Sequence, residues 1–499
     1  MRRSLQMFGV SSAFSFAISM LGLFELRAQP NDTIPCPMPW GPTTRVSHTT
    51  RDAFVPHLAI VGDTIHMVYY AGGCYYQRSN DKGETWVQET ELVPLDSMSG
   101  IPGIAASGSY AYVVWENRLP TGFIDAVKIR RSTNSGRDWE EPVELFINST
   151  SPGFGEPLVA VKSTQVYVTS TKPVGGVWHF FLIHSSDYGG HWDSIHQITS
   201  VEQSHASADI AASSSGLHLV CNRGIDFIHT MSTDFGVTWT REVYLSGIDP
   251  YRAWKPQVAV KNDSTIYTCW EDAKYGSSSG ASGTVLLRRS TDGGVTWQAE
   301  VRVSVLPSAA KSSLSANGDV VHVVWDDERN GATRGSIQYN VSADGGATWC
   351  GETTVGDTLD FDIDASIGCS DRFAVVGWSS YPNHTPYHAD VYSRVASWVV
   401  TGVPSTAIEP ALTPVSTLTA FPNPFNSTTH LSISLPKHGP VVLEVVDIIG
   451  RRVNMLADCV LESGEHTFAW DATALSSGVY ITRLLAGRTT VQAKLLLIR

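Results

Sequence analysis

The sequence predicts an all-β protein in which a ring of repeated four-stranded sheets, a β-propeller, precedes a small β-sandwich. A short motif with a serine, an aspartate, a glycine and a tryptophan recurs six times, for example at residues 290–297. The copies lie 53, 53, 47, 58 and 52 residues apart, which is the length of a unit with four strands. Helical periodicity is hard to find beyond the N-terminal segment, so we expect the fold to be built from strands.

The chain begins with a predicted signal peptide, residues 1–28. This segment has a basic start, an apolar run broken by small polar residues, and Ala28, after which a signal peptidase can cut. No later apolar run approaches the roughly 20 residues that a spanning helix needs, so we expect no transmembrane segment in the mature chain. The formal net charge of −13 argues against nucleic acid as a partner.

Seven cysteines are too few for a disulfide scaffold in a chain of 499 residues. Cys350 and Cys369 are the nearest candidate pair in the sequence, and the odd number leaves at least one thiol free or bonded to another molecule. The cysteines show no Cys-x-x-Cys spacing. We therefore predict no metal site and no cofactor.

Residues 39–400 repeat one order of strands. Residues 256–272 and 312–331 each contain an inner strand, a turn and a second strand with a tryptophan near its end, which indicates a hairpin. A variable loop, a third strand, the motif and an outer strand follow. The motif is therefore the turn between the third and fourth strands of each unit.

The two ends of this region complement each other. Residues 362–397 form a unit without the motif, whereas residues 39–50 resemble an outer strand without a unit before it. A last sheet that takes its outer strand from the N-terminus leaves the ring with no unpaired edge. We therefore predict seven blades. Six blades, the number of motifs, is the alternative, and residues 397–403 are an alternative fourth strand for the last blade.

The motif is predicted to be structural. An aspartate or asparagine oxygen accepts backbone N–H bonds within the turn, and glycine supplies positive φ. Calcium takes six or more oxygens, whereas each motif offers one such acid. Burial of the tryptophan is expected to contribute more to stability than the turn hydrogen bonds. The residues concerned are Asp81, Asn134, Asp187, Asp234, Asp292 and Asp344, with Trp86, Trp139, Trp192, Trp239, Trp297 and Trp349.

These motifs are similar to the Asp boxes, or BNR repeats, of sialidase-like β-propellers. The similarity covers about residues 40–400. It implies a seven-bladed (alternatively six-bladed) sialidase-like fold. It does not imply one activity, because such propellers serve as hydrolases, lectin-like binders and scaffolds.

A second module follows a linker, residues 401–420, that is rich in Pro, Thr, Ser and Ala. Period-2 alternation in residues 421–499 predicts a small immunoglobulin-like β-sandwich. The module resembles the type A C-terminal sorting domain of the type IX secretion system. The residues that carry the resemblance are Pro422, Asn423, Pro424, Asn426, Asp447, Gly450, Gly464, His466, Trp470, Gly478, Tyr480 and the terminal KLLLIR.

The resemblance implies a route of export. The signal peptide takes the chain to the periplasm, and residues 421–499 then engage the type IX machinery. The protein is expected to be secreted or to stay on the outer-membrane surface.

A working site is expected where the loops that enter the inner strands and those that follow the second strands meet at the central channel. Sialidases hold their substrate carboxylate with three arginines, the first of which lies in an Arg-Ile-Pro motif. The corresponding residues here are Phe54, Val55 and Pro56, so no catalytic residue is carried over from the family. The candidate ligand-binding arginines are Arg118, Arg252 and Arg329.

Four acidic residues follow two of the predicted second strands, and paired carboxylates there could hydrolyse a glycoside. The alternative is that they cap turns or pair with Arg329. The candidates are Glu271, Asp272, Asp326 and Asp327, together with Tyr381 and Tyr387 as possible nucleophiles.

Two further groups stand out in the loops. His384, His388 and Asp390 are close in sequence, but a loop gives them no shared helix face and surface histidines are common, so we predict no metal there. An aromatic shelf for sugar is the second hypothesis, with a core role for the tryptophans as its alternative. Its residues are Trp178, Tyr251, Trp254 and Lys255.

The predicted function is that of a secreted or cell-surface propeller that binds a glycan or a protein. The alternative is a glycoside hydrolase that resembles exo-α-sialidases and cleaves terminal sialic acid or another sugar. The absent first arginine leaves open whether the protein is an enzyme.

Overall fold

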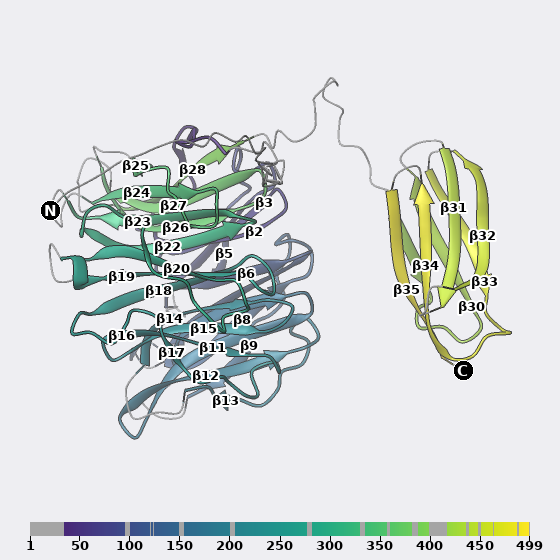
Figure 1. The fold of residues 1–499 in the computed structure, drawn as a ribbon, viewed down its shortest axis with the longest axis horizontal. Helices are drawn as coiled ribbons and strands as arrows, with labels where there is room; N and C mark the ends of the chain where they lie inside the picture. Colours follow the sequence, from purple (N-terminus) through teal and green to yellow (C-terminus); the bar gives the residue numbers. More distant parts are fainter. Residues whose placement is uncertain are drawn as a thin grey trace, which may run out of the picture. The chain divides into compact units, whose positions relative to one another are not determined.

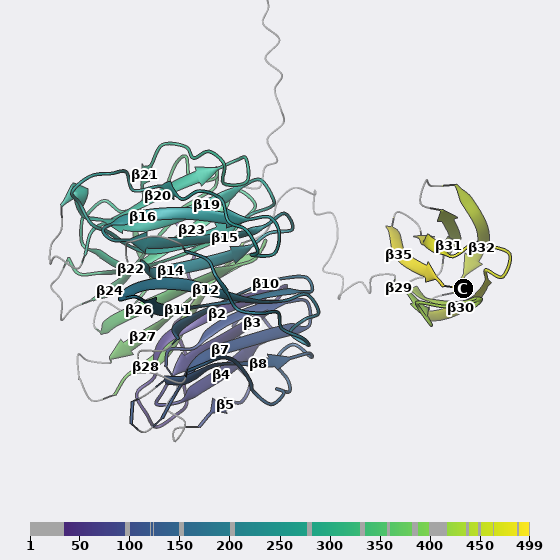
Figure 2. The ribbon, with the colours of Figure 1, turned by 90° about the horizontal axis from the view of Figure 1, so that it is seen from below.

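The computed structural model describes residues 34–498 except short segments, which are 95–99, 120, 123, 149–153, 200–204, 277–281, 330–334, 357–359, 382–387, 399–416, 436–438, 448–450, 463 and 487–488. The chain divides into two compact units, Met1–Gly402 and Val403–Arg499 (Figures 1 and 2). The predicted signal peptide and most of the predicted linker lie outside the described residues. Each unit is described by itself.

The smaller unit is a β-sandwich. One sheet has the order β29-β30-β33 and the other β32-β31-β34-β35. The bounds are β29 Thr417–Phe421, β30 Thr428–Leu435, β31 Gly439–Asp447, β32 Arg452–Leu461, β33 Gly464–Asp471, β34 Gly478–Ala486 and β35 Thr489–Leu497.

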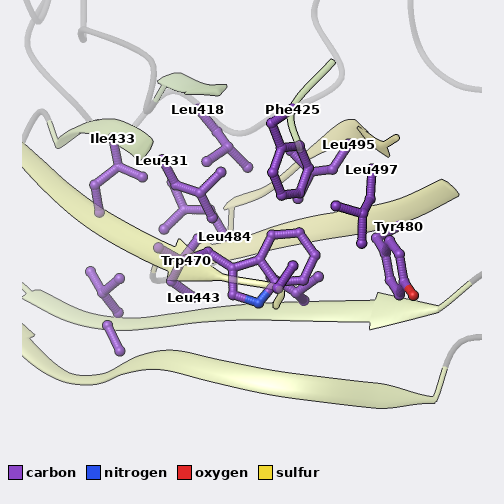
Figure 3. Close-up of a cluster of buried hydrophobic side chains, with 14 residues drawn as sticks. Leu418, Phe425, Leu431, Ile433, Leu443, Trp470, Tyr480, Leu484, Leu495 and Leu497 are labelled. Atoms are coloured by element: carbon purple, nitrogen blue, oxygen red, sulfur yellow. The ribbon is translucent and has the colours of Figure 1, made fainter. Parts of the chain in front are cut away.

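Alternating apolar residues of this unit meet in one core (Figure 3). The Trp470 side chain is fully buried, and its ring centroid lies 5.4 Å from that of Phe425 and 5.5 Å from that of Tyr480. Trp470 and Tyr480 therefore hold the sandwich together, since large aromatic rings bury the most apolar area.

The larger unit is a β-propeller. Its described residues form seven four-stranded antiparallel sheets, which we call blades. The inner strands contact one another in a closed cycle, from β2 through β6, β10, β14, β18, β22 and β26 back to β2. This cycle leaves no unpaired edge around the ring, which is the advantage of closed β architectures.

The first six blades follow chain order. Blade 1 has β2 Phe54–Val61, β3 Thr64–Tyr70, β4 Cys74–Ser79 and β5 Thr90–Val93. Blade 2 has β6 Gly103–Ser107, β7 Tyr110–Arg118, β8 Ile124–Ser132 and β9 Val143–Ile147. Blade 3 has β10 Gly155–Lys162, β11 Gln165–Val174, β12 Val177–Ser185 and β13 His196–Gln197. Blade 4 has β14 His205–Ala212, β15 Leu217–Arg223, β16 Asp226–Ser232 and β17 Val243–Tyr244. Blade 5 has β18 Ala253–Val260, β19 Ile266–Asp272, β20 Thr284–Ser290 and β21 Val301–Arg302. Blade 6 has β22 Ala309–Asn317, β23 Val320–Asp327, β24 Ser336–Ser342 and β25 Thr353–Thr354.

Blade 7 joins the two ends of the propeller. It has β26 Phe361–Cys369, β27 Phe373–Tyr381 and β28 Asp390–Ser397, and its outer strand is β1, Thr44–Arg45. Thr44 pairs with Ser393 and Arg45 with Tyr392. The outer strand of the last blade thus comes from the N-terminal segment, as the complementary ends of the sequence indicated.

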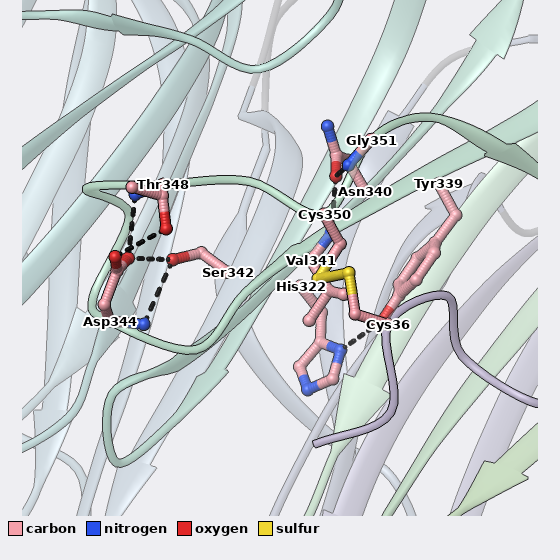
Figure 4. The surroundings of a disulfide bond; sticks show 10 residues. All are labelled: Cys36, His322, Tyr339, Asn340, Val341, Ser342, Asp344, Thr348, Cys350 and Gly351. Carbon is pink, nitrogen blue, oxygen red and sulfur yellow. Dashed lines mark hydrogen bonds between the residues drawn. A yellow bond between two sulfur atoms is a disulfide. The ribbon is translucent and has the colours of Figure 1, made fainter. Parts of the chain in front are cut away.

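A disulfide bond fastens the N-terminal segment to blade 6 (Figure 4). It joins Cys36 to Cys350, with 5.6 Å between the Cα atoms. The sequence-based pair of Cys350 with Cys369 is therefore wrong. Cys369 ends the inner strand of blade 7, where its Sγ lies 3.1 Å from the Ser315 hydroxyl. Ring closure brings Cys36 to Cys350, and spacing along the chain does not show this.

Ten tryptophans of the propeller belong to two groups, those of the second strands and those of the boxes. Those of the second strands, which are Trp115, Trp270, Trp325 and Trp378, have at most 2% of their surface exposed. The box tryptophans are only partly buried and pack against the edges of the cores. Within these two groups, the largest tryptophan burial therefore lies on the second strands.

Candidate functional site

Each of the recurring motifs, which we call boxes, is a closed turn held by its own side chains. In blade 5, Ser290 Oγ accepts from the Gly294 amide and donates to Asp292 Oδ1, both at 2.8 Å. Asp292 Oδ1 accepts from the Thr296 amide at 2.8 Å and Oδ2 from the Thr296 hydroxyl at 2.5 Å. These bonds, first the hydroxyl and then the amide, lower the pKa of Asp292 to about 2. Both carboxylate oxygens thus accept hydrogen bonds within the turn and fix its geometry.

Asn134 shows that this role needs no charge. Its Oδ1 accepts from the Ser132 hydroxyl at 3.1 Å and from the Asp138 amide at 2.9 Å. The same pattern surrounds Asp344 in blade 6 (Figure 4). An acceptor of the right length is what the turn requires.

The boxes also fasten each blade to itself and to its neighbour. In five blades, the residue after the box acid or amide donates its N–H to the turn between the first two strands. The pairs are Lys82 to Asp63, Ser135 to Ser109, Tyr188 to Thr164, Gly293 to Ser264 and Gly345 to Asp319. Arg78 of blade 1 also donates to the Ser135 carbonyl of blade 2, and Arg131 of blade 2 to the Tyr188 carbonyl of blade 3.

The opposite end of the blades is built differently. Six inner strands carry a register shift, and each contains a non-glycine residue with positive φ near its start. Such backbone costs free energy and clusters at sites of function. The residues are Val55, Glu156, Ser207, Lys255, Lys311 and Asp364.

A cavity of about 730 Å³ lies beside these bulges at the mouth of the channel. Blades 1 to 5 line it, and its charged or titratable residues are His57, Glu116, Arg118, Glu156, Asp209 and Lys255, with Tyr70. Burial lowers the pKa of His57 and raises that of Asp209 to about 6. Among the charged residues of the lining, Lys255 and Glu156 are exposed.

The residue after each second-strand tryptophan, an acid in three blades and a serine in the fourth, holds the next blade. Glu116 Oε1 accepts from the Glu156 amide at 2.6 Å, and Glu271 Oε1 accepts from the Ser312 amide at 2.6 Å. Asp326 accepts from the amides of Asp364 and Ala365 at 2.9 and 3.2 Å. In blade 7 the Ser379 hydroxyl accepts from the Val55 amide at 3.0 Å.

These contacts, which we call bulge clamps, fix the strained inner strands around the mouth. Burial raises the pKa of Glu271 to about 8 and that of Asp326 to about 7. Both candidate acids therefore have at least one oxygen committed to the backbone of a neighbouring blade.

The second acid after the tryptophan caps the loop that follows. Asp272 accepts from the Trp270 indole and the Lys274 amide, both at 2.9 Å. Asp327 accepts from the Trp325 indole at 3.3 Å and from two guanidinium nitrogens of Arg329 at 2.7 Å. This is the turn-capping and Arg-pairing alternative that the sequence offered.

The three candidate arginines occupy different surroundings. Arg118 lines the cavity and pairs with Glu116. Arg329 pairs with Asp327 and Glu352, and Arg252 is exposed. Neither of the latter two lines the cavity.

Tyr381 does not line the cavity either. Its ring centroid lies 6.0 Å from that of Phe54 and 5.6 Å from that of Phe361, and burial raises the pKa of its hydroxyl. Tyr387 and His384 lie outside the described residues. His388 approaches Asp52 and Asp390 at 3.5 and 3.4 Å, and Asp390 is also bonded to Arg45.

Exposed aromatic rings lie at the same end of the blades as the cavity. Trp178, at the turn between β11 and β12, is 40% exposed, and Tyr251, just before β18, is 48% exposed. Trp254 is half-buried, and Lys255 beside it lines the cavity. Two of the shelf residues proposed from the sequence thus present open ring surface.

The bulges and the bulge clamps were missed in the sequence. A signal was present, because tryptophan is followed by Glu, Asp or Ser at the ends of four second strands. Proline also follows the bulge residue in three inner strands, after Val55, Glu156 and Lys255.

Residues 419–498 match the family described as the secretion system C-terminal sorting domain. This match indicates type IX secretion to the cell surface or the outside. In the described part of the chain, no helix has the length and apolar character needed to cross a membrane. No curated protein sequence matches this chain.

Solved structures with a similar fold are sialidases and related β-propellers. The phage phi92 endosialidase is 12% identical over 92% of this chain and 88% of its own, with a TM-score of 0.46. The Hadza microbial sialidase Hz136 is 16% identical over 68% and 74%, with a TM-score of 0.41. YCF48 bound to D1 peptide is 13% identical over 73% and 97%, with a TM-score of 0.46.

Proposed function

We propose that this protein is a secreted or cell-surface propeller that binds a glycan at the mouth of its channel. The observation that carries the proposal is the cavity of about 730 Å³ with exposed Lys255 and Glu156 in its wall. Its volume lies within the roughly 300–1,000 Å³ of ligand pockets in general. Neither charged group is paired with another described side chain, so both are available to a ligand.

The surroundings of the cavity suit a sugar. The CH face of a pyranose packs on an aromatic ring, and its hydroxyls bond to polar groups. Trp178 and Tyr251 supply exposed rings at this end of the propeller, and Gln257 and Ser207 add polar groups to the lining.

Binding is favoured over hydrolysis by what the acidic residues do. A glycosidase needs two carboxyl groups free to face the scissile bond. Glu271 and Asp326 instead accept backbone bonds from the next blade, and Asp272 and Asp327 cap loops. Phe54 also stands where sialidases have their first arginine.

A glycan array probed with the full chain tests the proposal. A bound glycan should lose about tenfold in affinity in Trp178→Ala or Tyr251→Ala, since each removes a stacking ring. Ile195→Ala is the matched control, because Ile195 is also 40% exposed but follows the box of blade 3. Turnover of a fluorogenic sialoside, or binding that neither aromatic variant weakens, would contradict the proposal.

For export, we propose that residues 421–499 are the segment that the type IX machinery recognises and that residues 39–400 are its cargo. The family match over residues 419–498 supports this division. Removing residues 421–499 should leave the propeller in the periplasm, as detected by cell fractionation. Unchanged secretion of the shortened chain would oppose the proposal.

A further inference from the structure

The box of blade 4 differs from those of the other five box-bearing blades. In those five blades, the residue after the box acid or amide donates its N–H to the turn between the first two strands. In blade 4 that residue is Phe235, and within the described part of the chain its amide makes no such backbone bond. Phe235 has a φ of 63°, like its counterparts, so the box itself is formed normally.

The turn of blade 4 explains the difference, because it closes on itself. Ser213 donates its amide to the Gly216 carbonyl at 2.8 Å, and its Oγ accepts from the Ser215 and Gly216 amides at 3.2 and 3.0 Å. Asp263 of blade 5 accepts from the amides of Ser214 and Ser215 at 2.7 and 3.2 Å. The turn is thus bonded to blade 5, and its carbonyl is not offered to Phe235.

A cavity of about 260 Å³ lies at this place. The turn of blade 3, the turn of blade 4 and the box of blade 4 line it. Two aromatic rings face it, those of Tyr167 and Phe235, and Phe235 is 54% exposed. Six hydroxyl-bearing residues complete the wall: Ser163, Thr164, Ser213, Ser214, Ser215 and Thr233.

The polar wall is held in place by bonds behind it. His184 Nε2 lies 2.7 Å from Gln165 Oε1, and Gln165 Nε2 donates to the Thr164 hydroxyl at 2.7 Å. The Phe235 ring stacks on the His184 ring, with 5.5 Å between their centroids. Groups that are fixed in this way lose little entropy when a ligand binds.

We propose that this cavity is a second ligand site, distinct from the channel mouth, and that it takes a single neutral sugar ring. Hydroxyls and an uncommitted amide provide donors and acceptors for ring hydroxyls, and the exposed face of Phe235 provides a surface for ring CH groups. Lys162 is the one charged side chain among the lining residues and is exposed, so hydroxyl groups make up most of the polar wall.

Saturation-transfer NMR with the full chain tests this site. The probes are methyl β-D-glucoside, methyl β-D-galactoside and N-acetyl-D-glucosamine. Transfer to the ring protons of at least one probe is expected, with affinity about tenfold weaker in Phe235→Ala because the stacking ring is lost. Tyr188→Ala is the matched control, since Tyr188 has the same box position in blade 3 but keeps its turn bond.

Gln165→Ala removes a wall group without altering the box, and decides the question if Phe235→Ala does not fold. Loss of transfer in these variants, with Tyr188→Ala and Trp178→Ala unchanged, supports the site. Absence of transfer from all three probes overturns it. So does transfer that persists in Phe235→Ala and Gln165→Ala, or that Tyr188→Ala removes equally. Trp178 does not line this second cavity, so failure here is separate from failure of the proposed function.

Discussion

The two ends of the blades differ in how much their residues vary from one blade to the next. At the box end, Ser, Asp or Asn, and Gly recur with the same bonds in six blades. At the channel mouth, the bulge residues include Val55, Glu156, Ser207, Lys255 and Asp364, with different chemistry in nearly every blade. One end thus fixes the geometry of the ring, and the other is free to vary its chemistry, as is usual for loops on a rigid scaffold.

The largest expected effect separates two tryptophans of blade 5. Trp270→Ala should destabilise the propeller by about 3–5 kcal/mol, because it empties a fully buried site. Trp297→Ala should cost less, because the box tryptophan is only partly buried. Urea unfolding followed by far-UV circular dichroism measures both. Equal losses would show that the box end contributes as much to the core as the second strands.

The bulge clamp of Asp326 is expected to have the next largest effect. Asp326→Ala leaves the part-buried amide of Asp364 and the buried amide of Ala365 without their acceptor, at a cost of about 2–3 kcal/mol. Asp326→Asn restores one acceptor oxygen and should recover about half of this. Urea midpoints of the two variants provide the comparison. If Asp326→Ala were as stable as the wild type, the Asp326 clamp would not stabilise the mouth.

Glu271 gives the mouth end a pH dependence opposite in sign to that of the box aspartates, whose pKa values are lowered. Its folded pKa is raised to about 8, above the unfolded value near 4.5, so its contribution is present below about pH 4.5 and is lost as pH rises through 8. Glu271→Gln does not titrate. The variant should therefore gain stability relative to the wild type between pH 5 and 8, by about 1–3 kcal/mol.

Buried histidines give the wild type and the Glu271→Gln variant the same opposite dependence of stability on pH. Burial lowers the pKa of His229 and of His322 to about 3, so both proteins lose stability as pH falls below about 6.5. The difference in unfolding free energy between variant and wild type removes this common trend. A difference that stays constant from pH 5 to 8 would contradict the raised pKa of Glu271.

The smallest effect is expected from a single box acid. Asp344→Ala removes the acceptor for the Thr348 amide and hydroxyl, at a cost of about 1 kcal/mol. Asp344→Asn should cost less, since Asn134 fills the same role in blade 2. Thermal midpoints show the order. A larger loss of stability in Asp344→Asn than in Asp344→Ala would mean that the charge of Asp344 itself matters.

The repeated boxes made the ring predictable, because a local turn is encoded by adjacent residues. The outer strand that the N-terminus supplies to blade 7 was indicated for another reason, because the first and last units of the sequence each lack a part that the other has. The bulge clamps were not predictable in this way, since Glu271 and Ser312 lie on different blades and their bond depends on how the blades pack. The Cys36 partner depends on ring closure in the same sense.

The candidate site was predicted only in part. The sequence indicated the end of the blades at which the cavity lies, and it named Trp178 and Tyr251, whose rings are exposed. It also assigned the acids after the second strands to possible catalysis, because their neighbours in the next blade are not visible in the sequence. Tyr70, His57 and Asp209 entered the site only through the cavity that they line.

The most direct measurement compares one glycan, identified on the array, across two variants. The first has asparagine at all five box aspartates, which are Asp81, Asp187, Asp234, Asp292 and Asp344. The second is Trp178→Ala. Affinity should stay within about twofold of the wild type in the first and fall about tenfold in the second. Loss of affinity in the first, with the second unchanged, would place the ligand at the boxes and contradict their structural role.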